Sequence, residues 1–370
     1  MEHENPLGED RIHKLLIKFS LPAIVGMTVN SLYNFVDRIF IGNSPDLGPN
    51  GLAGITIAMP IMIMLLSVGV MFGVGGVTRF AIKLGEGNRE EAEKTLANAF
   101  MMIIISGVLF TIFGQIFLKP ILTVFGASPV VLPYVTDYMR VIFFGSVFQI
   151  GSMGLNHFIR ADGNPKTAMH TMFIGAGLNI ILDPIFIFGL RMGMRGAALA
   201  TVISQGISFL WVVYYFLSKS STNKFRKKYF KPDLLIIREI VSFGIPDSSL
   251  QFVSSFLNVL LNRTLYAYGG DIAVSVMGIV YSLMMLLLLP IIGLRQGLQP
   301  IISFNYGAKK FERVVTAAKL GIIIATLMST FSYIVTRIFP MQLIAMFNRD
   351  GDLLAFGEQA VKYWFLFMPV

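Results

Sequence analysis

The sequence contains no cysteine, only four histidines and few charged residues, which make up 14% of its 370 positions. Without thiols the chain cannot be a disulfide-stapled scaffold, and the histidines have none of the spacings typical of a metal-binding motif. A nucleotide-driven pump is excluded as well, because there is no Gly-x-x-x-x-Gly-Lys-Ser/Thr phosphate-binding loop. Soluble domains carry about 25% charged and about 45–50% apolar residues. Here 55% of the residues are hydrophobic and the mean hydropathy is +0.70, so the composition argues against a soluble fold.

Long apolar segments are what the sequence has instead. Each holds about 20 residues or more, enough to cross about 30 Å of hydrocarbon at about 1.5 Å per residue. Polar, turn-forming stretches such as 43–51, 83–94 and 160–166 separate them. We therefore predict an all-α, polytopic integral membrane protein. Its spans in this chain, about ten, are expected near 15–42, 52–82, 95–118, 138–159, 168–190, 197–217, 237–264, 272–304, 314–338 and from 358 onwards.

The net charge of +9 is divided unevenly between alternate loops. Most Lys and Arg side chains lie near the N-terminus, in the loops at 83–94, 160–166 and 309–313, and in a linker at 219–238. Because basic loops stay on the cytoplasmic side, we expect a multi-pass protein of the cell (inner, cytoplasmic) membrane with a cytoplasmic N-terminus. The basic linker fits this topology and attraction to anionic lipid, and no motif supports a nucleic-acid partner.

An internal repeat is visible in the sequence. The Phe-Ser-Leu-Pro sequence that ends at Pro22 recurs as the Phe-Gly-Ile-Pro sequence that ends at Pro246, an offset of 246 − 22 = 224. The Leu-Gly pair that begins at Leu84 corresponds to the Tyr-Gly pair that begins at Tyr306, an offset of 306 − 84 = 222. Six spans fall in the first repeat, and the second stops after three and a half.

The repeat predicts two pseudo-symmetric six-helix lobes with the same orientation in the membrane, an arrangement used by secondary transporters. We expect a twelve-span protein of about 440–450 residues, of which this chain is C-terminally incomplete. The predicted parts are an N-lobe at 1–218 with spans one to six, a basic cytoplasmic linker at 219–236, and a C-lobe at 237–370 with spans seven to ten.

Several motifs together resemble one known family. They are Asn34-Phe-Val-Asp37-Arg-Ile-Phe-Ile-Gly42, Ala-Asp162-Gly-Asn164-Pro165, Asn179-Ile-Ile-Leu-Asp183-Pro184 and Arg195-Gly196-Ala-Ala-Leu-Ala-Thr201. In combination they are similar to the multidrug and toxic compound extrusion (MATE) transporters. The resemblance implies two lobes in a V shape and outward export of mostly cationic organic compounds, driven by an inward proton or sodium gradient. We accordingly expect a secondary antiporter and not an enzyme, a monomer in membrane lipid with small cationic substrates and no cofactor besides the coupling ion.

Carboxylates are rare inside the predicted spans, and the two main ones are Asp37 and Asp183. A charged side chain near the membrane centre costs about 2.5–3.5 kcal/mol, so such residues usually face a bundle interior or a water-filled cavity. Asp37, Asp183 and Thr201 each lie roughly 8–10 Å from the predicted outer boundary. Asn179 and Asp183 share a helix face at i, i+4, as do Tyr33 and Asp37. The spacing permits one oxygen-rich cluster.

Such a cluster suits a coupling ion. Burial penalises an ionised carboxylate, so uptake of either a proton or a sodium ion would relieve the site. Sodium is a hard cation and favours carboxylate, amide and hydroxyl oxygens. In MATE transporters, as the resemblance implies, the matching residues bind the coupling ion, and we carry that role, with sodium as the candidate metal, to Asp37, Asn179, Asp183 and Thr201. Tyr33 and Asn156 are lesser candidates for the cavity.

Each of these residues also has a structural alternative. The alternative for Asp37 is an ion pair with its neighbour Arg38 at the outer interface. The alternative for Asp183 is a structural role, in which it accepts hydrogen bonds at the proline kink that follows it. The alternative for Asn179 and Thr201 is that their polar groups only join neighbouring helices. These alternatives differ in whether the polar atoms have partners within the protein.

Two other functions compete with the antiporter. An intramembrane aspartyl protease would use two aspartates, but the sequences around Asp37 and Asp183 lack that family's Tyr-Asp and Gly-x-Gly-Asp motifs. A flippase for lipid-linked oligosaccharide or polysaccharide, from the same superfamily, is the stronger alternative. It would need basic residues in its cavity to bind pyrophosphate, and the candidates Arg38, Arg263 and Arg295 are scattered.

Overall fold

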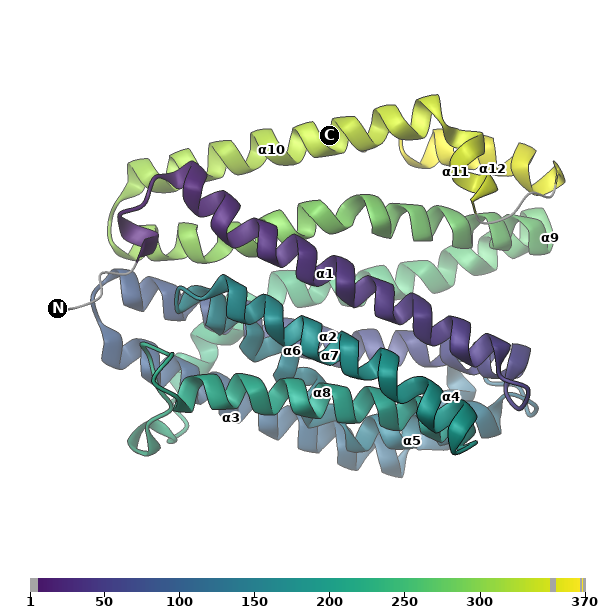
Figure 1. The fold of residues 1–370 in the computed structure, drawn as a ribbon, viewed down its shortest axis with the longest axis horizontal. Helices are drawn as coiled ribbons and strands as arrows, with labels where there is room; N and C mark the ends of the chain where they lie inside the picture. Colours follow the sequence, from purple (N-terminus) through teal and green to yellow (C-terminus); the bar gives the residue numbers. More distant parts are fainter. Residues whose placement is uncertain (1–5, 347–350, 367, 369–370) are drawn as a thin grey trace.

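The computed structural model describes residues 6–346, 351–366 and 368, and Figure 1 shows its long helices running along one common axis. The described residues form helices and connecting turns, with no strand among them. The helical elements are η1 (Pro6–Gly8), α1 (Ile12–Asn43), α2 (Gly48–Gly85), α3 (Arg89–Ile116), α4 (Leu118–Val124), α5 (Leu132–Phe144), α6 (Ser146–Ala161), α7 (Pro165–Pro184), η2 (Ile185–Gly189), α8 (Gly193–Leu217), η3 (Lys227–Tyr229), α9 (Leu234–Gly307), α10 (Phe311–Ile338), α11 (Pro340–Ala345) and α12 (Gly351–Trp364). The predicted all-α class is confirmed.

Seven helices of the described chain are long and apolar enough to cross a membrane. The number is eight when α5 and α6, which are bent by 57° at their junction, are counted as one span. The first six predicted spans correspond to α1, α2, α3, the α5–α6 pair, α7 with η2, and α8, and the ninth corresponds to α10. The tenth begins within α12, a helix of 14 residues. The protein is therefore a polytopic membrane protein.

The seventh and eighth predicted spans both lie in α9, which has 74 residues. The side chains of Asp247 and Arg295, both in α9, form an ion pair although they are 295 − 247 = 48 residues apart. A straight helix would separate them by about 70 Å at about 1.5 Å per residue. Helix α9 must therefore cross the molecule and return, as Figure 1 shows, and its second run, Val276–Gly307, is apolar enough to span a membrane.

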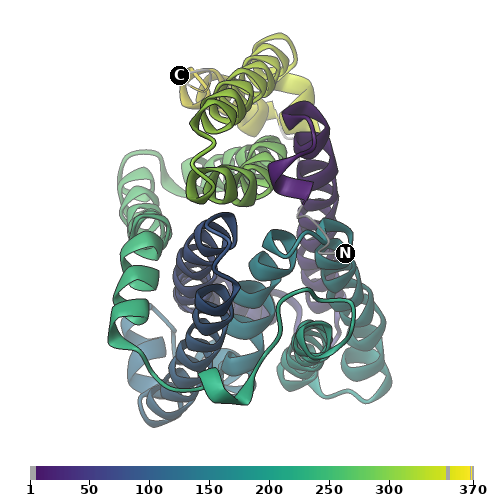
Figure 2. The same cartoon turned by 90° about the vertical axis from the view of Figure 1, so that its left-hand side faces the viewer.

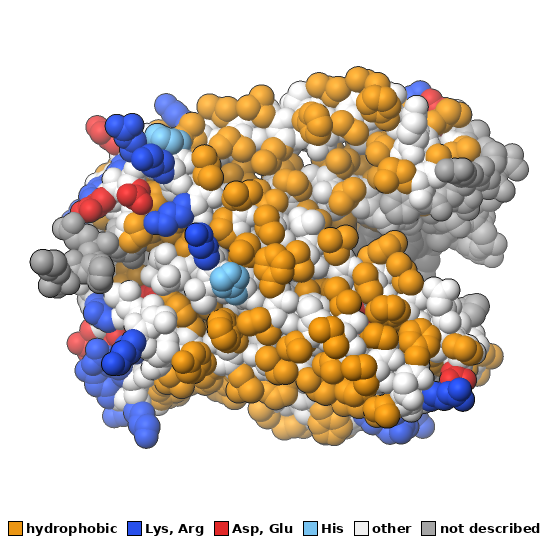
Figure 3. Space-filling model, viewed as in Figure 1, with side chains coloured by type: hydrophobic (Ala, Val, Ile, Leu, Met, Phe, Trp, Pro, Cys, Tyr) orange, Lys and Arg blue, Asp and Glu red, His pale blue; other side chains and the backbone are white. Residues whose placement is uncertain are grey.

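The outer surface is apolar over its middle and charged at its ends. Figure 3 shows a broad hydrophobic area between two ends that carry the Lys, Arg, Asp and Glu side chains. On α10, for example, Ile322, Leu327 and Phe331 are 64–68% exposed. In water such exposure would cost free energy, whereas lipid tails solvate these side chains.

Helix α1 packs against elements from both repeats. It contacts α7 on one side and α9 on the other, and the end-on view of Figure 2 shows it between them. At its N-terminal end, buried Leu15 and Phe19 join a hydrophobic cluster with Leu294 and Ile301 of α9. A change in α1 therefore affects the packing of the second repeat as well as the first.

Two glycines bring the repeats into reciprocal contact at the ends of α2 and α9. A Cβ atom at Gly85 would collide with the carbonyl oxygen of Phe304, and one at Gly307 would collide with that of Ile82. The two contacts are related by one offset, since 307 − 85 = 222 and 304 − 82 = 222. Only residues without a side chain permit this approach. This offset equals the offset of 222 found for the sequence repeat. The boundaries of the N-lobe (1–218), the linker (219–236) and the C-lobe (237–370) stay a prediction.

Candidate functional site

The four residues proposed to bind an ion gather in one buried cluster. Asp37 lies on α1, Asn179 and Asp183 on α7, and Thr201 on α8, and their exposed fractions are 8%, 1%, 0% and 5%. The carboxyl groups of Asp37 and Asp183 lie close enough for their charges to interact. The amide Nδ2 of Asn179 donates to Thr201 Oγ1 at 3.4 Å. The cluster therefore joins three helices of the first repeat.

Local backbone structure explains the position of Asp183. The next residue, Pro184, has no N–H and cannot continue the α-helical ladder, and the chain passes into a π-helical turn, η2. Such turns inside helices are frequent at functional sites. On α8, the Thr201 hydroxyl donates to the carbonyl oxygen of Ala197 at 3.1 Å. This bond fixes the hydroxyl proton on α8 and leaves an oxygen lone pair toward α7.

Most oxygens of the cluster lack a hydrogen-bond partner. Both carboxylate oxygens of Asp183, Oδ1 of Asp37 and Oδ1 of Asn179 are fully buried and receive no hydrogen bond from the residues that the structure describes. An unpaired buried polar group costs about 1–3 kcal/mol, and more if it is charged. Two adjacent buried carboxylates also repel each other unless a proton or a cation lies between them. The arrangement is thus a set of hard oxygen donors with unused capacity.

These oxygens decide between the structural alternatives. The guanidinium of Arg38 forms no ion pair with Asp37 among the described residues, and its Nη2 donates to Met59 Sδ at 3.3 Å. Asp183 does not stabilise the proline kink, because neither of its oxygens accepts a hydrogen bond within the described part of the chain. Asn179 does join α7 to α8 through its Nδ2, but its Oδ1 remains free.

Two tyrosines border the cluster. Tyr33 lies one turn before Asp37 on α1 and is close enough to both aspartates to interact with their charges. Tyr138 on α5 is 2% exposed, lies beside Thr201, and donates to Met62 Sδ at 3.8 Å. Tyr138 is not predictable from the sequence, because a tyrosine in an apolar helix carries no signal that separates it from ordinary core residues.

Asn156 lies outside this cluster. On α6, its Nδ2 donates to the carbonyl oxygen of Ala168 at 2.8 Å, and its Oδ1 accepts from Arg160 Nη1 at 2.6 Å. Arg160 is 2% exposed and also contacts His157 Nδ1 at 3.2 Å. Both ends of the Asn156 amide are therefore occupied, and the bond from its Nδ2 joins α6 to α7.

Another buried carboxylate, Asp162, has a contrasting environment. It accepts hydrogen bonds from Tyr215 Oη at 2.7 Å, Ser221 Oγ at 2.7 Å, the backbone N–H of Thr222 at 3.1 Å, and Asn223 through N at 3.2 Å and Nδ2 at 2.6 Å. Burial raises the pKa of Asp162 above its usual value, although these hydrogen bonds oppose the shift. Asp162 thus ties the α6–α7 turn to the start of the linker, and it has no capacity left for a ligand.

Transition-metal sites are not indicated. The described residues contain no group of three or more His, Cys, Asp or Glu side chains that could hold a metal ion. The cluster offers two carboxylates, an amide oxygen and a hydroxyl, and hard cations prefer such oxygen ligands. The donor set therefore fits a proton or a sodium ion.

Comparison with known proteins gives a consistent result. The MatE family model matches residues 22–185 and 248–370. The multidrug export protein MepA of Staphylococcus haemolyticus is 29% identical over 354 residues, which are 96% of this chain and 77% of that protein. The structure of an outward-facing multidrug resistance MATE family transporter of the MOP superfamily aligns with a TM-score of 0.92 and 26% identity, covering 100% of this chain and 82% of that chain. A MOP superfamily transporter from Pyrococcus furiosus, described as having a binding pocket of reverse polarity that suggests a different function, aligns with the same score, identity and coverage.

Proposed function

We propose that this chain, which belongs to the MatE family, is a secondary antiporter. Membership of the family makes it a multidrug efflux transporter of the membrane and not an enzyme. It exports cationic organic compounds and takes protons or sodium ions inward in exchange. The observation that carries this proposal is the set of four buried oxygens without partners, on Asp37, Asn179 and Asp183. They give the coupling ion a defined place to bind.

The proposed mechanism is alternating access. The ion enters the cluster from outside, the protein releases its substrate outward, and release of the ion inward resets the protein. Each charge that moves down the membrane potential supplies about 2.3 kcal/mol per 100 mV, enough for modest concentrative export. The ion's own contribution at the site is to neutralise the Asp37–Asp183 pair.

Helix α1 can transmit the state of this site. It carries Asp37 near its C-terminal end, and near its other end Ser20 Oγ donates to the carbonyl oxygen of Leu294 on α9 at 3.4 Å. Gly297 allows the close approach there, because a Cβ atom at Gly297 would collide with Ser20. We propose that ion binding changes the packing of α1 against α7, and that α1 passes the change to α9.

The proposal includes a monomer in the cell membrane with its N-terminus in the cytoplasm. The basic side chains support this orientation, because they gather at the end of the molecule where α1 begins, on the left in Figure 3. The multidrug export relatives do not favour the flippase alternative. Arg295, a candidate for binding pyrophosphate, is already paired with Asp247.

Transport by proteoliposomes tests the proposal. Vesicles loaded with a cationic dye are given a proton gradient, and in a separate run a sodium gradient, each of the direction that drives export. We expect dye movement above that of protein-free vesicles with at least one of the two gradients. Absence of movement with both gradients, combined with rescue of a cell-wall precursor defect in cells, would support the flippase instead.

A further inference from the structure

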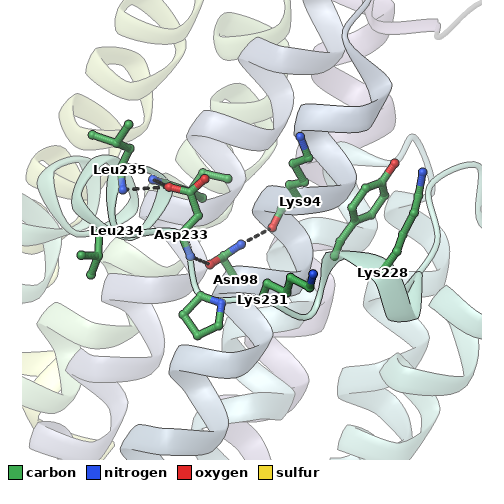
Figure 4. A pocket seen from close by; sticks show the side chains of 10 residues that line it. Lys94, Asn98, Lys228, Lys231, Asp233, Leu234 and Leu235 are labelled. Atoms are coloured by element: carbon green, nitrogen blue, oxygen red, sulfur yellow. Dashed lines mark hydrogen bonds between the residues drawn. The ribbon is translucent and has the colours of Figure 1, made fainter.

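A pocket of about 470 Å³ lies where the linker enters α9, at the end of the molecule proposed to be cytoplasmic. Figure 4 shows Lys94 and Asn98 of α3 between Lys228 of the linker and the start of α9 at Asp233, Leu234 and Leu235. The backbone N–H of Asp233 donates to Asn98 Oδ1 at 2.9 Å, which fixes the start of α9 against α3. The pocket is therefore formed by two elements held in place.

Positive charge dominates this pocket. Lys94, Lys228 and Lys231 line it, with Asp233 as the single carboxylate among the lining residues. Lys94 is already paired with acidic side chains of α3, at 3.0 Å and 3.3 Å. Lys228 lies over the ring of Tyr229 at 4.5 Å, and neither it nor Lys231 has an ion pair among the described residues. Two ammonium groups are thus available to an anion.

The carboxylate of Asp233 does not occupy these ammonium groups. Its Oδ1 accepts hydrogen bonds from the backbone N–H groups of Leu235 at 2.9 Å and Ile236 at 3.3 Å. It acts as the N-cap of α9 and offsets the unpaired N–H groups of the first turn. The charge of the pocket therefore remains net positive.

Apolar side chains lie beside the basic ones. Leu234 and Leu235, on the first turn of α9, are 81% and 73% exposed, and Phe230 before them is 36% exposed. A pocket for free phosphate gains nothing from exposed leucines. A phospholipid offers both groups that this surface would contact, a phosphate and acyl chains.

We propose that this pocket binds the phosphate group of an anionic phospholipid of the cytoplasmic leaflet. Lys228 and Lys231 hold the phosphate, and Leu234 and Leu235 contact the glycerol and upper acyl region. Basic pockets on the cytoplasmic side of membrane helices recognise anionic headgroups in this way, and long Lys side chains reach the headgroup level from apolar surroundings. The lipid would anchor the linker that joins the two repeats.

Native mass spectrometry of the purified protein tests this site. The protein is titrated with phosphatidylglycerol and, separately, with phosphatidylcholine. We expect tighter retention of phosphatidylglycerol, and we expect the double variant Lys228→Gln/Lys231→Gln to weaken it by about tenfold or more. The matched control is Lys219→Gln/Lys227→Gln, which removes the same charge from exposed linker lysines outside the pocket and should leave the affinity unchanged.

Further measurements distinguish a lipid ligand from free phosphate, and a loss of lipid binding from a loss of folding. The variant Leu234→Ser/Leu235→Ser should weaken phosphatidylglycerol binding, and millimolar inorganic phosphate should not displace the lipid. Thermal unfolding of the lysine variants should match that of the wild type. Equal retention of the two lipids, an equal loss in the control variant, or displacement by inorganic phosphate would each overturn the proposal.

Discussion

Two buried aspartates have opposite surroundings: Asp162 in the turn before α7 and Asp183 near the C-terminal end of α7. Asp162 accepts hydrogen bonds from a tyrosine, a serine, an asparagine and backbone N–H groups, whereas Asp183 accepts none from any described residue. A carboxylate with all its partners contributes to stability and specifies a structure. One without partners is costly to keep buried, so a function is the better explanation for Asp183.

Replacing Asp183 should uncouple transport. In Asp183→Asn the side chain keeps its shape but loses its charge, so the cluster keeps only the Asp37 carboxylate and binds a cation more weakly. We expect gradient-driven dye export to fall at least about tenfold, equivalent to about 1.4 kcal/mol, with the protein still folded. The control is Asp46→Asn, in the exposed loop between α1 and α2. Export that is unchanged by Asp183→Asn would refute the assignment.

Replacing Asp162 should lower stability instead. In Asp162→Asn an NH₂ group would face donors that now bind a carboxylate oxygen, at a cost of about 1–3 kcal/mol. Because burial raises the pKa of Asp162, the folded protein binds the proton more tightly than the unfolded chain. The wild type should therefore lose stability relative to the variant as pH rises from about 3.9 through that raised pKa, and the difference should be constant above it. Thermal unfolding in detergent across this pH range measures both effects, and equal melting temperatures at neutral pH would contradict the argument.

The sequence predicted the candidate cluster from helix geometry and depth. Asp37, Asp183 and Thr201 were placed at one level by counting from span ends, and Asn179 by its i, i+4 spacing from Asp183. Tyr138 could not be predicted, because its part depends on how α5 packs beside α8. The engagement of Asn156 with Arg160 depends equally on tertiary packing.

At the level of helices, close contact between α2 and α9 is the feature that links the repeats. Gly85 and Gly307 exclude side chains at one end of this contact, and Gly75 and Gly244 exclude them further along it. The sequence predicted two spans within α9 from hydropathy. The Asp247–Arg295 pair shows which side chains of the two runs meet, and hydropathy does not predict such a contact.

A bulky residue at Gly307 should separate these helices. Gly307→Leu would drive a side chain into the Ile82 carbonyl, at a cost of about 1–3 kcal/mol, which shifts a conformational equilibrium by about 5- to 150-fold. Because the chain has no cysteine, Glu86→Cys and Tyr306→Cys can carry the only spin labels. Electron–electron distance measurements should show a longer distance in Gly307→Leu.

The matched control for this experiment is Gly278→Leu. Gly278 is also in α9, but a Cβ atom there would meet nothing within 4 Å. Its distance distribution should equal that of the labelled parent. If Gly307→Leu also leaves the distribution unchanged, the glycine contact does not control the approach of the repeats.

For the whole molecule, amino-acid composition predicted the membrane environment of the protein, but it did not predict the directions of all the helices. Low charge and high hydropathy correspond to the apolar surface between two charged ends (Figure 3). The bend of 57° between α5 and α6 was not predicted, because both helices fall in one apolar segment. Hydropathy registers the length of an apolar segment and not its direction.

Orientation in the membrane can be measured with two introduced cysteines. Ser128 and Ser220 are exposed residues in loops that the positive-inside rule assigns to opposite sides. In intact cells, a membrane-impermeant maleimide should label Ser128→Cys and should label Ser220→Cys only after permeabilisation. The reverse pattern would place the N-terminus outside.

The central claim is that the Asp37–Asp183 cluster binds the cation that drives export, and reciprocal coupling provides the most direct test. In proteoliposomes without an ion gradient, an imposed gradient of substrate should drive net movement of the coupling ion and so build up an ion gradient, because coupling between two sites acts in both directions. The measurement is proton flux from an internal pH dye, and sodium flux from radioactive sodium, during substrate movement. We predict substrate-driven flux of one of these ions in the wild type and none in Asp37→Asn/Asp183→Asn. Undiminished ion flux in the double variant would contradict the account.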